Sequence, residues 1–159
     1  MKKGFTIIEF MIYISILSVA IAAMGLVSMN VFSVGARTDA IQEVAHNGRF
    51  AMHKIGSTIN EANSLIIPSQ QGSIIQLAFT DPSRNPTTFD VTAGKLRITE
   101  AGRSPINLTT SKVVVDRIFF TRVSNDSIRV EMNISFHNPQ NLPEHNFNNF
   151  FLSSFVLGR

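Results

Sequence analysis

The sequence of 159 residues contains no cysteine, and its first proline is Pro68. Without cysteine the chain can form neither a disulfide framework nor a thiolate metal or redox site. A glycine-rich phosphate-binding loop and a Gly-x-Ser-x-Gly nucleophile elbow are also missing from the sequence. The chain therefore has no motif for nucleotide-dependent chemistry or for serine-hydrolase chemistry.

Histidines and acidic residues are present but form no recognisable ligand or catalytic set. His46 and His53 are seven residues apart on a predicted helix, on nearly the same face, and no third ligand accompanies them. Most acidic residues fall on predicted turns or strand faces, where they favour solubility. We predict no catalytic residue, no cofactor-binding residue and no metal site, and hence no enzyme.

The positive charge is concentrated at one end of the chain. The formal net charge of +3 includes Lys2 and Lys3; without them, the 14 basic residues fall to 12, against 11 acidic residues. The remainder is close to neutral and carries no basic stripe interleaved with aromatics. We therefore predict no direct nucleic-acid partner.

A long apolar run follows the two lysines. No charged side chain occurs from Phe10 to Ala36, and about 20 apolar residues are enough to cross a bilayer. Lys2 and Lys3 would hold the N-terminus in the cytoplasm. One carboxylate, Glu9, lies at the start of the run, although an acidic residue deep in a bilayer costs roughly 3 kcal/mol. Such a residue predicts a function that a simple membrane anchor does not need.

This N-terminus resembles that of type IV prepilins and of the pseudopilins of type II secretion. The resemblance rests on a short basic leader ending in Gly4, followed by Phe5-Thr6-Ile7-Ile8-Glu9 and the apolar run. It implies cleavage after Gly4 by prepilin peptidase, methylation of the new amino group of Phe5, and polymerisation in which Glu9 is the assembly charge. The implied partners are prepilin peptidase, the inner membrane, an assembly platform and other pilin subunits in an extracytoplasmic pilus or pseudopilus.

Three roles stay open for the carboxylate of Glu9. It can pair with the Phe5 amine of its own chain, four residues away on the same helical face. The family resemblance suggests pairing with the N-terminus of a neighbouring subunit instead. The third role is to complement the positive end of the helix dipole, worth about 0.3–1 kcal/mol.

Beyond Arg37 the apolar residues narrow to one helical stripe. Pro68 cannot continue a helix and disfavours the helical region for the residue before it, so we predict one helix from Phe5 to about Ile66. Its second half should pack on a domain. The predicted stripe, at alternating spacings of four and three, comprises Ile41, Ala45, Gly48, Met52, Ile55, Ile59, Ala62 and Ile66.

The remainder of the chain has the short period of β-strands. Ala93-Gly94 predicts one hairpin and Ser124-Asn125-Asp126 a second. The segment 138–149 is rich in Asn and Pro and predicts a loop. The predicted strands are 74–80, 88–92, 95–99, 113–123, 127–136 and 150–157.

These elements define the predicted organisation. The fold class is α+β and pilin-like: a long N-terminal helix, membrane-spanning in its first half and amphipathic in its second, packed on an antiparallel β-sheet. The expected division is a leader at 1–4, a membrane or filament-core helix at 5–36 and a globular domain at 37–159. Within that domain the helix occupies 37–67 and the sheet 74–157.

Weaker resemblances point to a subgroup. The stretches Arg49–Ile55, Val113–Phe120 and Phe155–Arg159 look like those of minor pilins of the W kind and of J pseudopilins. Many major pilins have a proline about four-fifths of the way through the span, where this chain has Gly25. These features favour a minor subunit.

Alternatives remain for the N-terminus and for the whole chain. An ordinary secretory signal could end at Ala20-Ile21-Ala22, but Glu9 would then lie inside its apolar core. A plain single-pass anchor explains the length of the run but neither Glu9 nor the leader. For the whole chain, the alternatives are a pseudopilin of type II secretion and a monomeric membrane-anchored binding domain.

Overall fold

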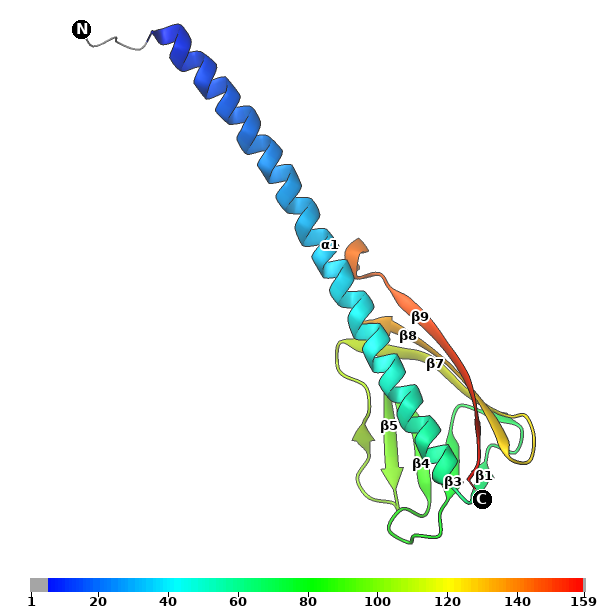
Figure 1. The fold of residues 1–159 in the computed structure, drawn as a ribbon. Helices are drawn as coiled ribbons and strands as arrows, with labels where there is room; N and C mark the ends of the chain where they lie inside the picture. Colours follow the sequence, from blue (N-terminus) through cyan, green and yellow to red (C-terminus); the bar gives the residue numbers. More distant parts are fainter. Residues whose placement is uncertain (1–5, 159) are drawn as a thin grey trace. The chain divides into compact units, whose positions relative to one another are not determined.

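The computed structural model describes residues 6–158, apart from the side chains of Met29 and Asn30. The chain divides into two units at the bond between Ala36 and Arg37. One helix, α1 (Ile7–Glu61), contributes to both. The architecture is α+β as predicted, with the second half of α1 packed against antiparallel β-structure (Figure 1).

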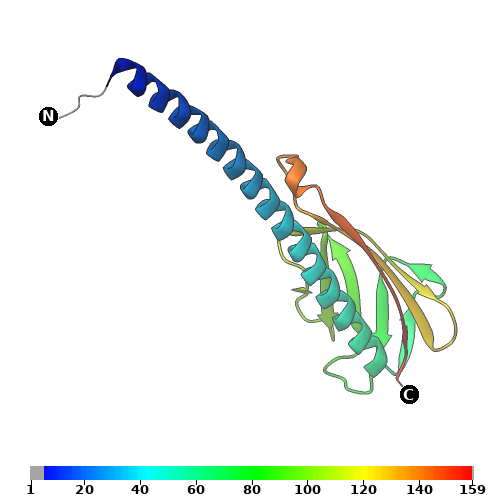
Figure 2. The ribbon, with the colours of Figure 1, turned by 45° about the horizontal axis from the view of Figure 1, so that its top comes forward.

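Two antiparallel sheets, rather than the single predicted sheet, make up the β-structure. The five-stranded sheet has the order β1-β3-β4-β5-β6, and the four-stranded sheet the order β2-β7-β8-β9. The two sheets lie against the second half of α1 (Figure 2), and both contribute buried side chains to one core. The strands are β1 (Ser64–Ile67), β2 (Gln71–Gly72), β3 (Ile75–Ala78), β4 (Thr87–Thr92), β5 (Lys95–Glu100), β6 (Ile106–Asn107), β7 (Val113–Arg122), β8 (Ser127–Phe136) and β9 (Asn148–Val156).

Both predicted hairpins are confirmed. Ala93 and Gly94 join β4 to β5 with positive φ values of 51° and 70°, as a two-residue turn of this kind requires. The loop 123–126 joins β7 to β8, and the alternating apolar residues of β8 are buried from Ile128 to Ile134. The predicted 138–149 loop contains a 3₁₀ turn, η1 (Pro143–His145), and strand β9 begins at Asn148, inside the predicted loop and before the predicted strand start at residue 150.

The prediction that the helix continues to Ile66 is wrong. α1 ends at Glu61, and Ser64–Ile67 forms strand β1 instead. The side chain of Asn63 accepts hydrogen bonds from the N–H and the hydroxyl of Thr80. The backbone N–H of Asn63 donates to Ala78 O. These bonds commit the chain to the edge of β3 five residues before Pro68 could end the helix. The domain helix is therefore shorter than the predicted 37–67, and β-structure begins before residue 74.

The predicted helix stripe is correct from Gly48 to Ala62 and wrong at both ends. Ile41 and Ala45 are not buried, and the exposed Ile66 lies in strand β1 rather than in the helix. Met52, Ile55, Ile59 and Ala62 are buried, but Ile41 is 38% exposed. The buried residues of the first turns are instead Ala40, Val44, Asn47 and Ala51. These also follow spacings of four and three, but two small alanines and an amide give a weaker apolar signal than Ile41. Because Ile41 has the larger apolar side chain, the predicted stripe in the first turns lies about one residue around the helix from the buried stripe.

Two glycines set the distance between α1 and β9. A Cβ on Gly48 would lie 2.1 Å from the ring of Phe151, and one on Gly56 would lie 2.2 Å from the ring of Phe155. Eight helical residues rise about 12 Å, and four strand residues about 13 Å. The two glycines and the two rings therefore match in spacing, so the strand follows the helix closely.

Candidate functional site

The first turn of α1 contains a reciprocal cap between Thr6 and Glu9. The Glu9 N–H donates to Thr6 Oγ1 at 3.2 Å. In return, the N–H and the hydroxyl of Thr6 donate to Glu9 Oε2, both at 3.4 Å. This arrangement is a capping box, in which a threonine and a glutamate three residues later satisfy donors at a helix start. The spacing Thr-x-x-Glu is visible in the sequence, but the sequence-based prediction for Glu9 concerned its charge alone.

The cap does not use all the hydrogen-bond acceptor sites of the Glu9 carboxylate. Both bonds to Oε2 are long for hydrogen bonds, and Glu9 Oε1 accepts no hydrogen bond from the described residues. The side chain is exposed at the end of the helix where the dipole favours a negative charge. The carboxylate is therefore held at the start of the apolar helix, with an oxygen still available to an ammonium group.

Two of the predicted site residues, Gly4 and Phe5, lie outside the described residues. The helix begins at Ile7 rather than at Phe5, because Thr6 takes the capping position. Cleavage after Gly4, methylation of Phe5 and pairing of its amine with Glu9 stay predictions.

The helix that follows the cap exposes apolar side chains. The described large apolar side chains from Ile7 to Val34 are 50–80% exposed. Within the described residues, α1 is the one helix long and apolar enough to cross a membrane. Ser15 and Ser28 donate to carbonyls of the preceding turn, at 2.9 Å to Met11 O and Met24 O respectively. Because these hydroxyls are satisfied within the helix, they add little to the cost of placing it in lipid.

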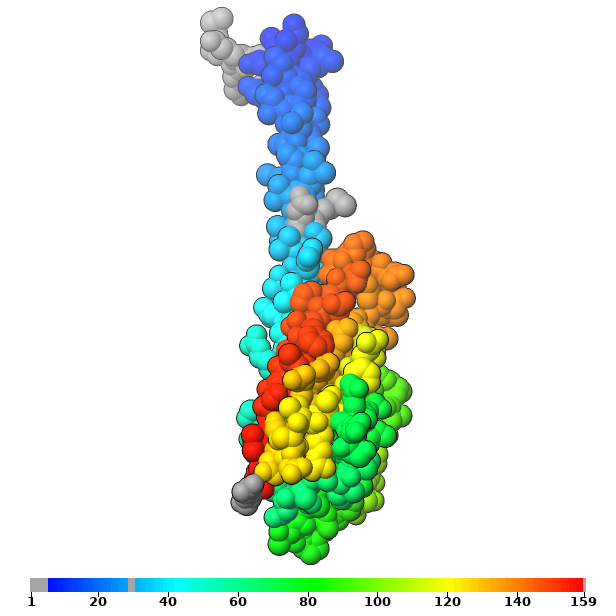
Figure 3. Space-filling view, turned by 90° about the vertical axis from the view of Figure 1, so that its right-hand side faces the viewer, coloured from blue at the N-terminus to red at the C-terminus, as the bar shows by residue number. Residues whose placement is uncertain are grey.

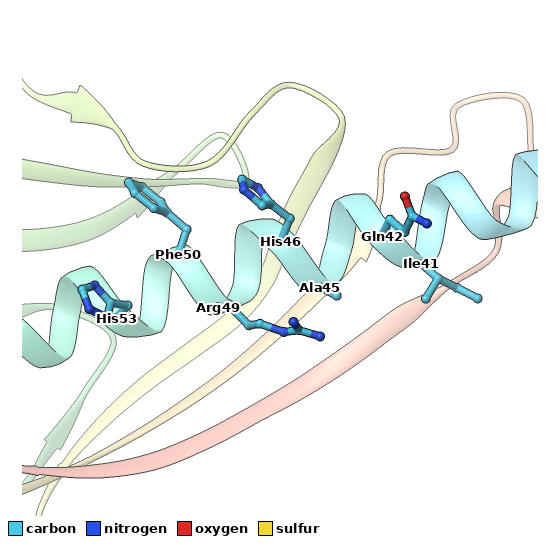
Figure 4. A pocket seen from close by; sticks show the side chains of 7 residues that line it. All are labelled: Ile41, Gln42, Ala45, His46, Arg49, Phe50 and His53. Atoms are coloured by element: carbon cyan, nitrogen blue, oxygen red, sulfur yellow. The ribbon is translucent and has the colours of Figure 1, made fainter.

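A second surface feature lies on the outer face of α1 in the domain. His46 and His53 line a shallow groove together with Ile41, Arg49 and Phe50 (Figure 4). Both histidines are exposed. Within residues 6–158 no group of three or more His, Cys, Asp or Glu side chains is placed to hold a metal ion.

Glu43 ties α1 to the loop that leads into β7. Its carboxylate accepts hydrogen bonds from the hydroxyl of Thr110 at 3.0 Å, from Asn47 Nδ2 at 3.1 Å and from Lys112 Nζ at 3.3 Å. Partial burial acts to raise the pKa of Glu43, but these donors together outweigh it and lower the pKa below its ordinary value of 4.5. The group serves the packing of the helix rather than proton transfer.

The comparison with known protein families gives one match. Residues 1–25 match the family described as the prokaryotic N-terminal methylation motif. The matched segment includes Gly4, Phe5, the capping pair and the first part of the apolar helix. Comparison with curated proteins and with solved structures gave no match. The match supports the type IV pilin-like resemblance and indicates prepilin-type processing of the N-terminus.

Proposed function

We propose that this chain is a structural subunit, of the minor class, in a type IV pilus-like filament. Prepilin peptidase removes residues 1–4 and methylates Phe5, and an assembly platform moves the subunit from the inner membrane into the filament. The apolar half of α1 then exchanges lipid for the equivalent helices of other subunits. The chain itself catalyses nothing.

The observation that carries this proposal is the first turn of α1. The capping box holds the Glu9 carboxylate at the start of an exposed apolar helix, and Oε1 has no partner in the described residues. A charge in such a place needs a partner of opposite sign, since unpaired charges are costly in apolar surroundings. The methylated amino group of Phe5 on a neighbouring subunit, which keeps its positive charge, supplies one.

The capping box also provides a sharp test of the role of Glu9. Glutamine can replace glutamate in a capping box, but it carries no charge. Glu9→Gln therefore keeps the cap and removes the ion pair, whereas Thr6→Ala weakens the cap and keeps the charge. We expect Glu9→Gln to reduce incorporation of the subunit into sheared filaments at least tenfold, and Thr6→Ala to reduce it much less.

The measurement compares tagged wild-type and variant subunits in filaments with those left in the membrane. Equal partitioning of Glu9→Gln and wild type, with a loss for Thr6→Ala, would reduce Glu9 to a helix cap and contradict the assembly role. Recovery of every form from the membrane, with none in filaments, would favour the monomeric anchored domain.

Processing is tested separately by the intact mass of membrane-extracted protein. The proposal expects Phe5 at the N-terminus, and Gly4→Lys should block cleavage because a bulky charged side chain replaces the small residue at the cut. A start at Ala23 would indicate a secretory signal, and an intact Met1 a plain anchor.

The second candidate function is a pseudopilin of a type II secretion system. The weak resemblance of 49–55 and 113–120 to J pseudopilins supports it as much as it supports a W-type minor pilin. The loss of secretion, rather than of surface filaments, in a strain lacking this chain would select the pseudopilin.

A further inference from the structure

The hydroxyl of Thr6 determines where α1 begins. Thr6 is not helical, and its carbonyl accepts the hydrogen bond of the first helical turn, from Phe10 N at 3.1 Å. If the helix began one residue earlier, the Glu9 N–H would donate to the carbonyl of Phe5. It donates instead to Thr6 Oγ1 at 3.2 Å. Thr6 and Glu9 are exposed, at the dark blue end of α1 in Figure 3, so the cap alone limits the helix there.

The bond at which we propose cleavage, between Gly4 and Phe5, precedes this cap. Hydrolysis adds water across the amide, so that the carbonyl carbon of Gly4 becomes a carboxylate and Phe5 gains a free amine. An extended peptide can pair its backbone groups with a binding protein, whereas helical backbone groups are already bonded to one another. A site that is helical for part of the time is cleaved in proportion to its open population, provided that opening is fast.

The leader offers a second place for the helix to begin. Glycine is about as favourable as threonine at the N-cap, so Gly4 can take this position when residue 6 cannot. A helix capped by Gly4 would use the Gly4 carbonyl as its first acceptor, for the N–H of Ile8. The carbonyl that water must attack would then be bonded within the helix. Thr6 therefore decides between two helix starts, of which one blocks the cleavage site.

Two phenylalanines favour the start that Thr6 sets. Phe5 immediately precedes the cap, and Phe10 is the fourth residue of α1. These are the two positions of a hydrophobic staple, which fixes the angle at which the chain enters a helix. Capping box and staple positions coincide only for a helix that begins at Ile7.

We propose that Thr6 is a positioning residue for processing: its cap keeps the Gly4–Phe5 bond outside α1, so that prepilin peptidase meets this bond in extended chain. The inference rests on the proposed function, because it requires processing after Gly4. It adds a role for Thr6 that differs from the role of Glu9, since it concerns the precursor rather than assembly of the mature subunit.

The test is the initial rate at which purified prepilin peptidase cleaves the full-length chain in detergent micelles, followed by intact mass. Thr6→Ala should be cleaved about fivefold more slowly than wild type, because losing such a cap shifts the balance of helix starts by about that factor. Thr6→Ser retains a capping hydroxyl and should be cleaved at close to the wild-type rate. The loss is one of rate, so Thr6→Ala subunits that accumulate during growth are still processed and can enter filaments.

A proline at the next position separates positioning from direct recognition of the threonine. Proline is favoured at the first helical position and disfavours a helical conformation for the residue before it, so Ile7→Pro imposes the same helix start without a cap. Thr6→Ala/Ile7→Pro should therefore be cleaved as fast as Ile7→Pro alone. If the double variant is as slow as Thr6→Ala while Ile7→Pro matches wild type, the peptidase reads the Thr6 side chain directly and the proposal is overturned.

The helix start is also measured without the peptidase. The ¹³C chemical shifts of Phe5 in the full-length chain in micelles should be non-helical in wild type and in Thr6→Ser, and should move toward helical values in Thr6→Ala. Unchanged Phe5 shifts in Thr6→Ala overturn the proposal whatever the cleavage rates, and so does cleavage of Thr6→Ala at the wild-type rate. Both results would leave the proposed function intact, whereas a wild-type chain that is not cleaved at all would contradict both proposals.

Discussion

The two halves of α1 form one continuous helix, but they differ in how far their apolar side chains are buried. From Ile7 to Val34 the described large apolar side chains are at least half exposed, whereas Val44, Ile55 and Ile59 in the second half are fully buried. The second half finds its apolar partners in its own chain, in the two sheets. Within the described residues the apolar side chains of the first half are exposed, so we expect their partners to be lipid or other proteins. Exposed apolar surface on this scale marks an interaction site.

The largest effect is expected from a charge placed on the buried face of the second half. Ile55 is fully buried, so Ile55→Asp places a carboxylate in the core and should lower the free energy of unfolding by about 4 kcal/mol or more. The measurement is the thermal midpoint of the unit 37–159 produced without residues 1–36. Ile41→Asp is the matched control, because Ile41 lies on the exposed face of the same helix.

Similar losses for Ile55→Asp and Ile41→Asp would contradict the observed helix face. A small change for both would mean that the second half of α1, like the first, finds its partners outside the chain. Either result would break the comparison between the two halves.

A smaller effect is expected where β9 meets the helix. Gly56→Val adds a branched side chain where the ring of Phe155 lies 2.2 Å from an added Cβ, and overpacking of this kind costs about 1–3 kcal/mol. In the Phe155→Ala background the same substitution should cost markedly less, because the ring is gone. Denaturant unfolding of the four forms gives this coupling energy. Additive losses would show that the ring is not what requires glycine at this position.

The sequence predicted those features whose signal is local. The turn at Ala93-Gly94, the alternation along β8 and the apolar run before Ala36 each depend on residues close together in the chain, and all three are found in the structure. The end of the helix was not predicted because it depends on hydrogen bonds between residues that are distant in the sequence. These bonds join Asn63 to Thr80, which donates, and to Ala78, which accepts. The division into two sheets was missed for the same reason, since strand order is set by long-range pairing.

The candidate site was predicted as a set of residues but not as an arrangement. Glu9 was identified by its charge, and the Thr6 cap was overlooked although its spacing is local. In the first turns of the domain helix, Ala40 and Val44 were passed over because Ile41 has the larger apolar side chain. Which of two adjacent stripes faces the sheets depends on how β9 packs on Gly48 and Gly56, and the rings of Phe151 and Phe155 that contact these glycines are distant in the sequence.

Lowering the pH should have a smaller effect than these substitutions, and it should affect the unit that contains the second half of α1 rather than the apolar first half. The pKa of Glu43 is lowered in the folded state, so the group contributes stability that is present above its ordinary pKa of 4.5 and is lost as the pH falls through the lower folded value. Asp90 adds to this, because its hydrogen bond from Arg97 lowers its pKa below 3.8. From Phe10 to Ala36 no side chain titrates in acid.

We therefore expect the thermal midpoint of the unit 37–159 to fall by several degrees between about pH 5 and pH 3. In Glu43→Gln the fall should be shallower, since one titrating group is removed. Helical circular dichroism of residues 10–36 in detergent micelles should stay constant over the same range. An unchanged slope in Glu43→Gln would show that its three hydrogen bonds contribute little to stability.

The smallest effect concerns two hydroxyls that make the same local bond in the two halves. Ser15 Oγ donates to Met11 O at 2.9 Å, and Thr58 Oγ1 donates to Lys54 O at 2.7 Å. Thr58 is 1% exposed, so Thr58→Ala leaves a small void in the core and should cost about 1 kcal/mol in the unfolding of the unit 37–159. Ser15 is exposed and its hydroxyl is already hydrogen-bonded within the helix, so Ser15→Ala should change the free energy of membrane insertion by less than about 0.5 kcal/mol.

The informative readout for Ser15→Ala is its partition between membrane and sheared filaments, measured beside Glu9→Gln. Equal partition with wild type is expected if lipid and neighbouring helices meet this face only through apolar contacts. A loss comparable to that of Glu9→Gln would mean that the hydroxyl leaves its own helix to bind a neighbour, and that the first half of α1 recognises its partners by polar groups beyond Glu9.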